Sequence, residues 1–317
     1  MDFVYKIYKI DGQKKHELKK PEKNCWIDIS NPTSEDISKL KSFIEITDEV
    51  LISVDDAEEV PKLEKLDDYN FLVLQTPVVV DPAKPSYRTM PLGILYNSDC
   101  LVTIYFGKND VLDYLKLKLE NLSRNRIVST ARRPQFILKL MLLTSKFYLT
   151  YLKQLTYGIN RAQEKFQHDP NGRDIHSMME FGKALSYFSG YLQANQMVYL
   201  KITKKPLFRA NEEDIDLCED LLDENQQALE AVKIHNKILH STISTFANLI
   251  SNKLNENVKY LTTISIILMM PTLVASVYGM NLVLPFQGHE QAFVIVMLMA
   301  VLLTLVLVIF FFRKKLF

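Results

Sequence analysis

Uncharged polar side chains recur at helical spacing between residues 255 and 276. They fall at offsets of 0, 7, 10, 17 and 21: Asn255, Thr262, Ser265, Thr272 and Ser276. At 100° per residue these five positions span about 100° of one helix face. Amide and hydroxyl oxygens arranged in this way can line a path for a cation that keeps its water shell, which Mg²⁺ releases reluctantly. The alternative is that small polar residues only let transmembrane helices pack closely.

Apolar residues lie beside this polar stripe, at Val258, Leu261 and Met269. Upstream, Asn248 and Asn252 lead into Asn255 at i, i+4 and i+7. The stripe contains no ring of charged side chains and no acidic cage. An apolar constriction at Leu261 or Met269 would therefore be able to gate the path by excluding water.

Two long segments contain no Lys, Arg, Asp or Glu, and the stripe lies in the first of them. They cover 260–288 and 291–312. Each exceeds the roughly 20 residues that a helix needs to cross a hydrocarbon core. We therefore predict transmembrane helices at 258–278 and 292–312, joined by an external loop at 279–291. A pair of buried core helices at the end of a chain is the less common alternative.

The basic residues that flank the spans predict the orientation. Lys253 and Lys259 precede the first span and a basic tail, 313–317, follows the second, whereas the loop between the spans has neither Lys nor Arg. Positive residues close to membrane ends favour the cytoplasmic side. The start of the chain lacks the apolar core of a signal peptide. We expect a two-pass protein of the cell membrane with both termini in the cytoplasm.

The remainder of the chain predicts a soluble α/β domain followed by long helices. Apolar runs at 3–10, 71–80, 90–97 and 100–106 are typical of strands, helices are expected at 33–44 and 109–121, and the lysine-rich stretch 14–20 is expected to be a loop. The α/β domain covers 1–132. A helical hairpin at 133–205 follows, with its turn at 168–174. A cytoplasmic stalk helix covers 206–257 and leads into the first span.

The stalk and the first span are expected to form one helix from about 211 to 277. Neither Gly nor Pro occurs between Asn211 and Met270, and Asn211 can cap the start. At 1.5 Å per residue the helix would be roughly 100 Å long. Such a helix would expose large apolar side chains unless copies of the chain bundled together. These side chains are Leu217, Leu221, Leu222, Ile234, Ile238 and Leu249.

Composition excludes several functions. The chain has 38 Lys and Arg against 37 Asp and Glu, a balance that argues against nucleic acid as a partner. Cys25, Cys100 and Cys218 show no CxxC spacing and are typical of reduced, packed thiols. No GxxxxGK[ST] loop and no HExxH motif occurs. We expect neither an enzyme nor a protein with a bound cofactor.

Tyr278-Gly279-Met280-Asn281 closes the first span after a long helix without gaps, and with it the chain resembles the CorA family of magnesium transport proteins. Further family-like segments occur along nearly the whole chain. They are WIDISNPT at 26–33, VPKLEKLDDYNFLVL at 60–74, SNKLNENVKYLT at 251–262, MMPT at 269–272 and RKKLF at 313–317.

The resemblance implies a funnel-shaped homopentamer in which the first transmembrane helices line a pore. It implies transport of Mg²⁺, often with Co²⁺ or Ni²⁺, and inhibition when Mg²⁺ binds between cytoplasmic domains as a regulatory ligand. The family's pore-lining residues would fall on Asn255, Val258, Leu261, Met269, Thr272 and Asn281. Gly279, Met280 and Asn281 would recognise the arriving ion.

The regulatory acids match the family pattern only in part. One would fall on Asp220, with Asp223 a turn further. The other would fall on Ser53, which is not an acid, with Asp55 and Asp56 close by. The second sensing site therefore departs from the family.

We therefore expect a channel-like carrier of divalent cations in a lipid membrane, working as an assembly of identical chains. A membrane potential would drive a divalent ion inward with about 4.6 kcal/mol per 100 mV, without ATP. A zinc-transporting relative on the same scaffold and a membrane-anchored metal sensor without flux are the alternatives. In this hypothesis Gly279 lets the helix end in a tight bend, and Asn281 offers its carbonyl oxygen to the waters of a hydrated ion. A simple helix cap is the other interpretation of these two residues.

Overall fold

The chain forms two compact units, Met1–Thr242 and Ile243–Phe317. The computed structural model describes residues 5–11, 14–41, 46–81, 86–120, 129–168, 172–281, 285, 288 and 290–314. The expected loop at 279–291 and the basic tail at 313–317 lie only partly inside these ranges. The first two residues of the strand expected at 3–10 lie outside them.

A seven-stranded sheet forms the centre of the first unit. Its strand order is β2-β1-β3-β7-β6-β5-β4, and all neighbours are antiparallel except β3 and β7. The strands are β1 (Tyr5–Asp11), β2 (Lys14–Leu18), β3 (Cys25–Ser30), β4 (Lys62–Lys65), β5 (Asn70–Asp81), β6 (Ser86–Tyr96) and β7 (Cys100–Tyr105).

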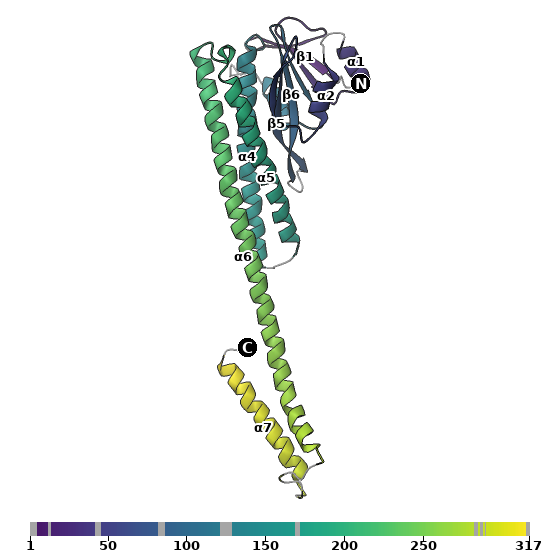
Figure 1. The fold of residues 1–317 in the computed structure, drawn as a ribbon, viewed down its shortest axis with the longest axis vertical. Coiled ribbons are helices and arrows are strands. Elements are labelled where there is room, and N and C mark those ends of the chain that lie inside the picture. Colours follow the sequence, from purple (N-terminus) through teal and green to yellow (C-terminus); the bar gives the residue numbers. More distant parts are fainter. Residues whose placement is uncertain are drawn as a thin grey trace. The chain divides into compact units, whose positions relative to one another are not determined.

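Helices cover both faces of this sheet. Figure 1 shows α2 on one side and α4, α5 and the beginning of α6 on the other. The helices are α1 (Ser34–Leu40), α2 (Asp48–Asp55), α3 (Asp110–Glu120), α4 (Arg133–His168), α5 (Gly172–Ile202), α6 (Glu212–Tyr278) and α7 (Ala292–Arg313), with a 3₁₀ turn at Pro206–Phe208.

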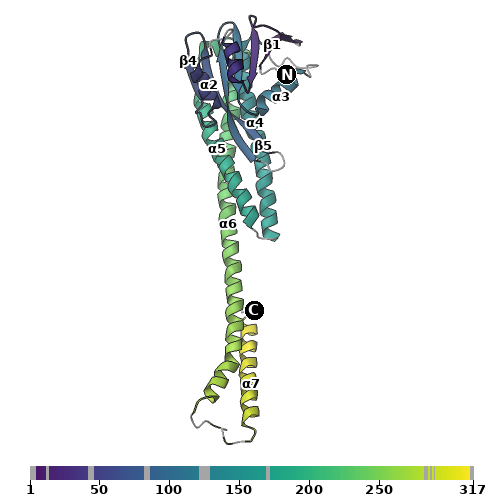
Figure 2. The same cartoon turned by 90° about the vertical axis from the view of Figure 1, so that its right-hand side faces the viewer.

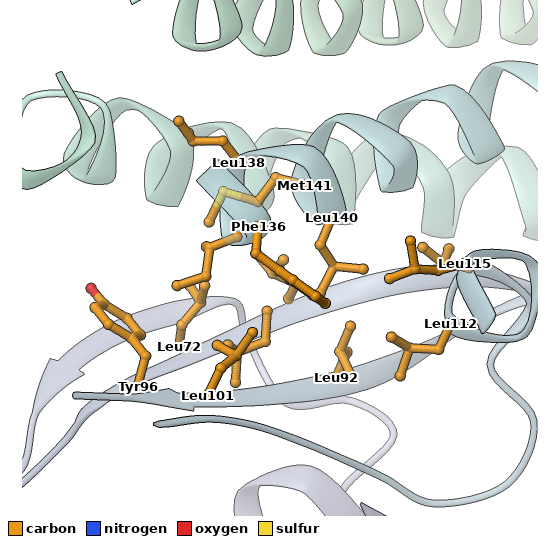
Figure 3. Packing of buried hydrophobic residues seen from close by; sticks show 14 of the residues in the cluster. Leu72, Leu92, Tyr96, Leu101, Leu112, Leu115, Phe136, Leu138, Leu140 and Met141 are labelled. Atoms are coloured by element: carbon orange, nitrogen blue, oxygen red, sulfur yellow. The ribbon is translucent and has the colours of Figure 1, made fainter. Parts of the chain in front are cut away.

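Side chains on each central strand alternate between two hydrophobic clusters. On β5, Leu72 and Leu74 belong to the cluster that also takes residues from α3, α4, α5 and α6, whereas Phe71 and Val73 belong to the cluster that takes residues from α2. Figure 3 shows Leu72 with other strand residues packed against α3 and α4. The period of two along a strand therefore divides the apolar residues between the two helical layers.

Most of the predicted elements are confirmed, and the differences have physical causes. The strands expected at 71–80, 90–97 and 100–106 correspond to β5, β6 and β7, and the two long helices of the hairpin correspond to α4 and α5. The loop expected at 14–20 is wrong: Lys14–Leu18 forms the edge strand β2, paired with β1. Lysine-rich sequence is compatible with an edge strand because its charges discourage pairing with further chains.

Three elements were missed because they lack a clear period. Strand β3 is buried at five of its six positions, so its polar and apolar residues do not alternate visibly, and β4 has four residues. Helix α2 has eight residues, too few to show a sustained helical pattern.

The beginning of α6 packs inside its own subunit, which corrects the expectation of exposed leucines. Leu221 is fully buried in the cluster that contains α4, and Leu217 and Leu222 pack against the same cluster. The Asn211 side chain accepts a hydrogen bond from the Asp214 N–H at 2.9 Å, which confirms the predicted cap. The remaining apolar side chains of the expected set stay exposed: Ile234, Ile238 and Leu249.

The second unit consists of the C-terminal part of α6 and helix α7. Both helices are long and apolar enough to cross a membrane. Figures 1 and 2 show α7 returning in the direction opposite to α6. Helix α6 itself runs without interruption from Glu212 to Tyr278, in agreement with the expected 211–277, and Pro271 lies inside it.

Gly93 on β6 provides a test of the packing between the sheet and α2. A Cβ atom at this position would lie 2.5 Å from Val54 Cγ2 on α2. Because a β-branched valine is stiff, we expect Gly93→Ala to lower the free energy of unfolding by about 1–3 kcal/mol. Urea titration followed by the fluorescence of Trp26, the only tryptophan, measures this.

The matched control is Gly190→Ala on α5. Nothing lies within 4 Å of a Cβ atom there. Alanine inside a helix is expected to raise stability by about 0.5–1 kcal/mol. Equal effects of the two substitutions would contradict the close approach of α2 to β6.

Candidate ion pathway

Helix α6 meets α7 along one face of the first span. Among the described residues of the two spans, only Thr263 (4% exposed), Val274 (8%) and Ala300 (6%) are buried. Thr263 and Val274 are eleven residues apart on α6, so they lie within about 20° of each other around the helix. The face that carries them is therefore the one that α7 covers.

All eight residues predicted to line a path are exposed in the single subunit. They lie roughly 80° to 200° around the helix from Thr263, on the side away from α7. They are Asn255, Val258, Leu261, Thr262, Ser265, Met269, Thr272 and Ser276. A face that avoids the chain's own second span is free to face other copies or water.

Three hydroxyl groups of this face donate their protons within the helix. Thr262 donates to the Val258 carbonyl and Ser265 to the Leu261 carbonyl, both at 2.8 Å. Thr272 donates to the Leu268 carbonyl at 3.3 Å. Each hydroxyl uses its one hydrogen inside the helix. Its oxygen can still accept hydrogen bonds from groups outside the helix. These three hydroxyls therefore present acceptors, which suit a cation or the waters around it.

Three apolar side chains share the face with these hydroxyls. Val258, Leu261 and Met269 expose more than half of their area in the subunit. They are interspersed along the helix with Thr262, Ser265 and Thr272. Hydrophobic rings between polar rings are the arrangement that allows gating by exclusion of water.

Helix α6 ends at the Gly-Met-Asn sequence through backbone hydrogen bonds. Gly279 N–H donates to the Ala275 carbonyl at 2.9 Å, and Met280 N–H donates to the Val277 carbonyl at 3.3 Å. These bonds satisfy the Ala275 and Val277 carbonyls with main-chain donors, and the exposed Asn281 follows them.

Gly279 differs from the expectation of a special backbone angle. Its φ does not lie in the positive range that favours glycine. A Cβ atom there would instead lie 3.2 Å from the Ala275 carbonyl oxygen. The bend itself therefore does not demand a glycine through its φ, and a side chain there would be in tight contact with this carbonyl.

Comparison with known proteins identifies the family of the chain. The family model described as CorA-like Mg²⁺ transporter protein matches residues 21–314. The chain belongs to this family. Because its members are transporters, the expectation that the chain is not an enzyme is confirmed.

Two CorA relatives match over most of the chain. The cobalt/magnesium transport protein CorA of Methanocaldococcus jannaschii is 26% identical, over 92% of this chain and 90% of the relative. The protein of the same name from Thermotoga maritima is 21% identical, over 92% of this chain and 82% of the relative.

The fold matches that of a complete CorA structure. The solved CorA magnesium transporter of Methanocaldococcus jannaschii superposes with a TM-score of 0.85 at 24% identity, covering 99% of this chain and 98% of that chain. The predicted combination of an α/β domain, a long stalk helix and apolar C-terminal helices is thereby confirmed.

The acids that the resemblance to the CorA family marked as regulatory lie on or next to two different helices. Asp220 and Asp223 are exposed on α6, and Asp55 and Asp56 are exposed at the end of α2. Figure 1 shows these two helices on opposite sides of the sheet. The described residues contain no group of three His, Cys, Asp or Glu side chains that could hold a metal. A cation shared by these acids would therefore have to lie between subunits.

Ser53, at the position of the second CorA regulatory acid, is unsuited to binding a cation from solution. It is only 6% exposed and lies on α2 between Ile52, which is exposed, and Val54, which is buried. The neighbouring Asp56 reaches solvent, and its carboxylate accepts a hydrogen bond from the Glu58 N–H at 2.9 Å. Asp55 and Asp56, at the end of α2, remain the candidate regulatory acids near Ser53.

Gln75 fixes this acidic turn and was missed in the sequence. Its side-chain Nε2 donates to the carbonyls of Ala57 (3.1 Å) and Glu59 (2.9 Å), just beyond Asp56. Asn195 on α5 binds both the N–H and the carbonyl of Gln75, at 3.1 and 2.8 Å, on the edge of β5 where the pairing with β4 has ended at Val73. A glutamine inside an apolar strand is the one signal that pointed to this link.

The environment of the stripe can be tested by cysteine labelling in a protein whose three native cysteines are replaced by serine. We expect Ser265→Cys in membranes to react with a charged, membrane-impermeant thiol reagent that has access to the pathway. Thr263→Cys, which faces α7, is the matched control and is expected to stay unreacted. Ile264→Cys, exposed on a flank outside the stripe, should also stay unreacted because lipid or a neighbouring helix excludes the reagent.

Equal reaction at Ser265→Cys and Ile264→Cys would contradict a stripe that faces water selectively. Absence of reaction at Ser265→Cys in a reagent-permeable preparation would favour the packing interpretation of the stripe.

Proposed function

We propose that copies of this chain assemble around a membrane pathway for divalent cations, with Mg²⁺ as the main substrate and Co²⁺ or Ni²⁺ also carried. The observation that carries the proposal is the uncharged polar stripe on the face of α6 away from α7. Family membership and the names of the cobalt/magnesium relatives support the choice of ions.

The chemistry of the stripe favours an ion that keeps its water. Hydroxyl and amide oxygens accept hydrogen bonds from the inner waters of a cation, and no carboxylate on the stripe replaces those waters. Weak, repeated contacts hold the ion without trapping it. We assign this role to the acceptors at Thr262, Ser265 and Thr272, with the Asn281 amide added at the end of the helix.

Assembly into a ring follows from the faces of α6. One face is covered by α7, the opposite face carries the stripe, and apolar side chains such as Ile264 and Leu268 occupy the flank between them. Several copies that packed through their flanks would turn their stripes toward a common axis. A homopentamer is our proposal for the number of copies, on the resemblance to the family.

The orientation that we propose places both termini on the cytoplasmic side. Lys253, Lys259, Arg313 and Lys314 flank the spans at one membrane surface, and residues 279–291 lie at the other. In the cell membrane the potential then drives cations inward past Asn281 first, with about 4.6 kcal/mol per 100 mV for a divalent ion.

Proteoliposomes that contain the purified protein test the proposal. We expect uptake of Mg²⁺, and of Co²⁺ and Ni²⁺, under an inside-negative potential. We expect Asn281→Ala to abolish Mg²⁺ uptake while the assembly persists in size-exclusion chromatography, because the hydrated ion loses its first amide contact. Gln227→Ala, which removes an exposed amide from α6 in the first unit, is the control and should transport normally.

The other results have definite meanings. Uptake of Zn²⁺ alone would identify a zinc-transporting relative on this scaffold. No uptake of any of the four ions would identify a membrane-anchored sensor or scaffold. Normal uptake by assembled Asn281→Ala protein would refute the role of the amide in ion recognition.

Asp220 and Asp223 give a separate prediction about regulation. We propose that these carboxylates face a neighbouring subunit and repel its acids unless a cation lies between them. Replacing both with Ala should keep uptake active at millimolar internal Mg²⁺, where the unmodified protein slows. Uptake rate against internal Mg²⁺ concentration measures this.

Glu230→Ala is the control, since it removes an exposed acid two turns further along α6. Its inhibition curve should match that of the unmodified protein. An unchanged curve for the Asp220 and Asp223 double variant would mean that these are solvated acids and that inhibition arises elsewhere.

A further inference from the structure

Two of the three cysteines stand opposite each other in the sheet. Cys25 is the first residue of β3 and Cys100 is the first residue of β7, and the register of these parallel strands pairs them. Adjacent strands lie about 4.8 Å apart. This spacing falls within the range of about 4.4–6.8 Å between the Cα atoms of disulfide-bonded cysteines. Both side chains belong to the same hydrophobic cluster, so they point to the same face.

The turns before the two strands are bonded to each other. Asn24 N–H donates to the Asp99 carbonyl at 2.7 Å, immediately before the paired cysteines. The Asn97 side chain accepts a hydrogen bond from the Cys100 N–H at 2.9 Å and fixes the turn that enters β7. The cysteines are therefore held in register at a strand end, where the backbone beyond them is turn and can adjust more readily than a strand interior.

The two thiols differ in access. Cys100 is 9% exposed at the border of the cluster, whereas Cys25 is fully buried. Burial raises the pKa of both thiols. The Tyr69 hydroxyl lies 3.9 Å from Cys100 Sγ. An incoming reagent therefore reaches the sulfur of Cys100 before that of Cys25.

We propose that Cys25 and Cys100 are a reversible redox pair, which a small-molecule disulfide of the glutathione type converts to an intramolecular disulfide. The observations that carry this are the register, the shared face and the bonded turns. Cys100 acts as the attacking thiol and Cys25 as the resolving thiol.

The exchange balances in two steps. The Cys100 thiol gives its proton to water, its thiolate attacks one sulfur of the small disulfide, and one small thiolate leaves and takes up a proton. Cys25 then loses its proton and attacks the Cys100 sulfur, which expels the second small thiolate, and this also takes up a proton. The two protein thiols are oxidised by two electrons in total, and the small disulfide is reduced to two thiols.

The crosslink would join β3 to β7 beside the start of α4. Arg133, the first residue of α4, donates a hydrogen bond to the Asn24 side chain next to Cys25. Closing the segment between residues 25 and 100 restricts the unfolded chain and so stabilises the folded first unit. The third thiol, Cys218, lies in the other hydrophobic cluster and donates to the Phe208 carbonyl, so it has no part in the pair.

The test uses the purified full-length protein incubated with oxidised glutathione and digested without reduction. We expect mass spectrometry to find the Cys25 and Cys100 peptides linked, with the loss of two hydrogen atoms, and dithiothreitol to separate them. The oxidised protein should unfold at a higher temperature, as followed by Trp26 fluorescence. The rate of linking should rise with pH, because the raised pKa values leave little thiolate at neutral pH.

Variants separate the roles of the thiols. Cys218→Ser should link as the unmodified protein does. Cys25→Ser should stop at a glutathione adduct on Cys100, and Cys100→Ser should leave Cys25 unmodified. A stable adduct on Cys100 of the unmodified protein, without linked peptides, would overturn the pairing, and so would the absence of any reaction at Cys100. An adduct on Cys25 in Cys100→Ser would overturn the order of attack.

Discussion

The exclusion of water from hydrocarbon constrains the first span more than any other physical factor. A polar group in that environment must find a hydrogen-bond partner within the protein or face a cavity that contains water. Thr262, Ser265 and Thr272 meet this requirement by donating to helix carbonyls four residues earlier. They therefore remain compatible with a dry, closed pathway and still offer acceptor oxygens when the pathway is wet.

The same constraint explains why the stripe carries no charge. A carboxylate in the span would bind a divalent cation strongly and would be costly whenever the ion was absent. Amides and hydroxyls bind each water of a hydrated ion weakly and are stable without it. Helix α6 contacts α7 on one face and carries the stripe on the opposite face. The same helix can therefore pack within its subunit and line the pathway that we propose.

The first unit holds the acids apart by the two-sided packing of its sheet. Because side chains alternate between two clusters, α2 and α6 are attached to opposite faces, and their acids cannot meet within one chain. Gln75 and Asn195 secure the turn after α2 on the edge of β5 that β4 does not reach. The sheet therefore sets where each acid is presented, and a shared cation requires a second subunit.

Periodicity and composition alone determined the long helices and the membrane spans. A stretch without Gly or Pro defined α6, charge-free segments defined the spans, and the resemblance to CorA proteins rested on Gly279, Met280 and Asn281. These signals are local, because helix formation and transfer into lipid depend on residues close in sequence.

Tertiary structure alone decided which faces are covered. It buried Leu221 against the chain's own α4, paired Lys14–Leu18 as an edge strand, and placed Cys25 opposite Cys100. It also showed that Gly279 adopts no positive φ. Such outcomes depend on strand register and on contacts between residues far apart in sequence, which no local period encodes.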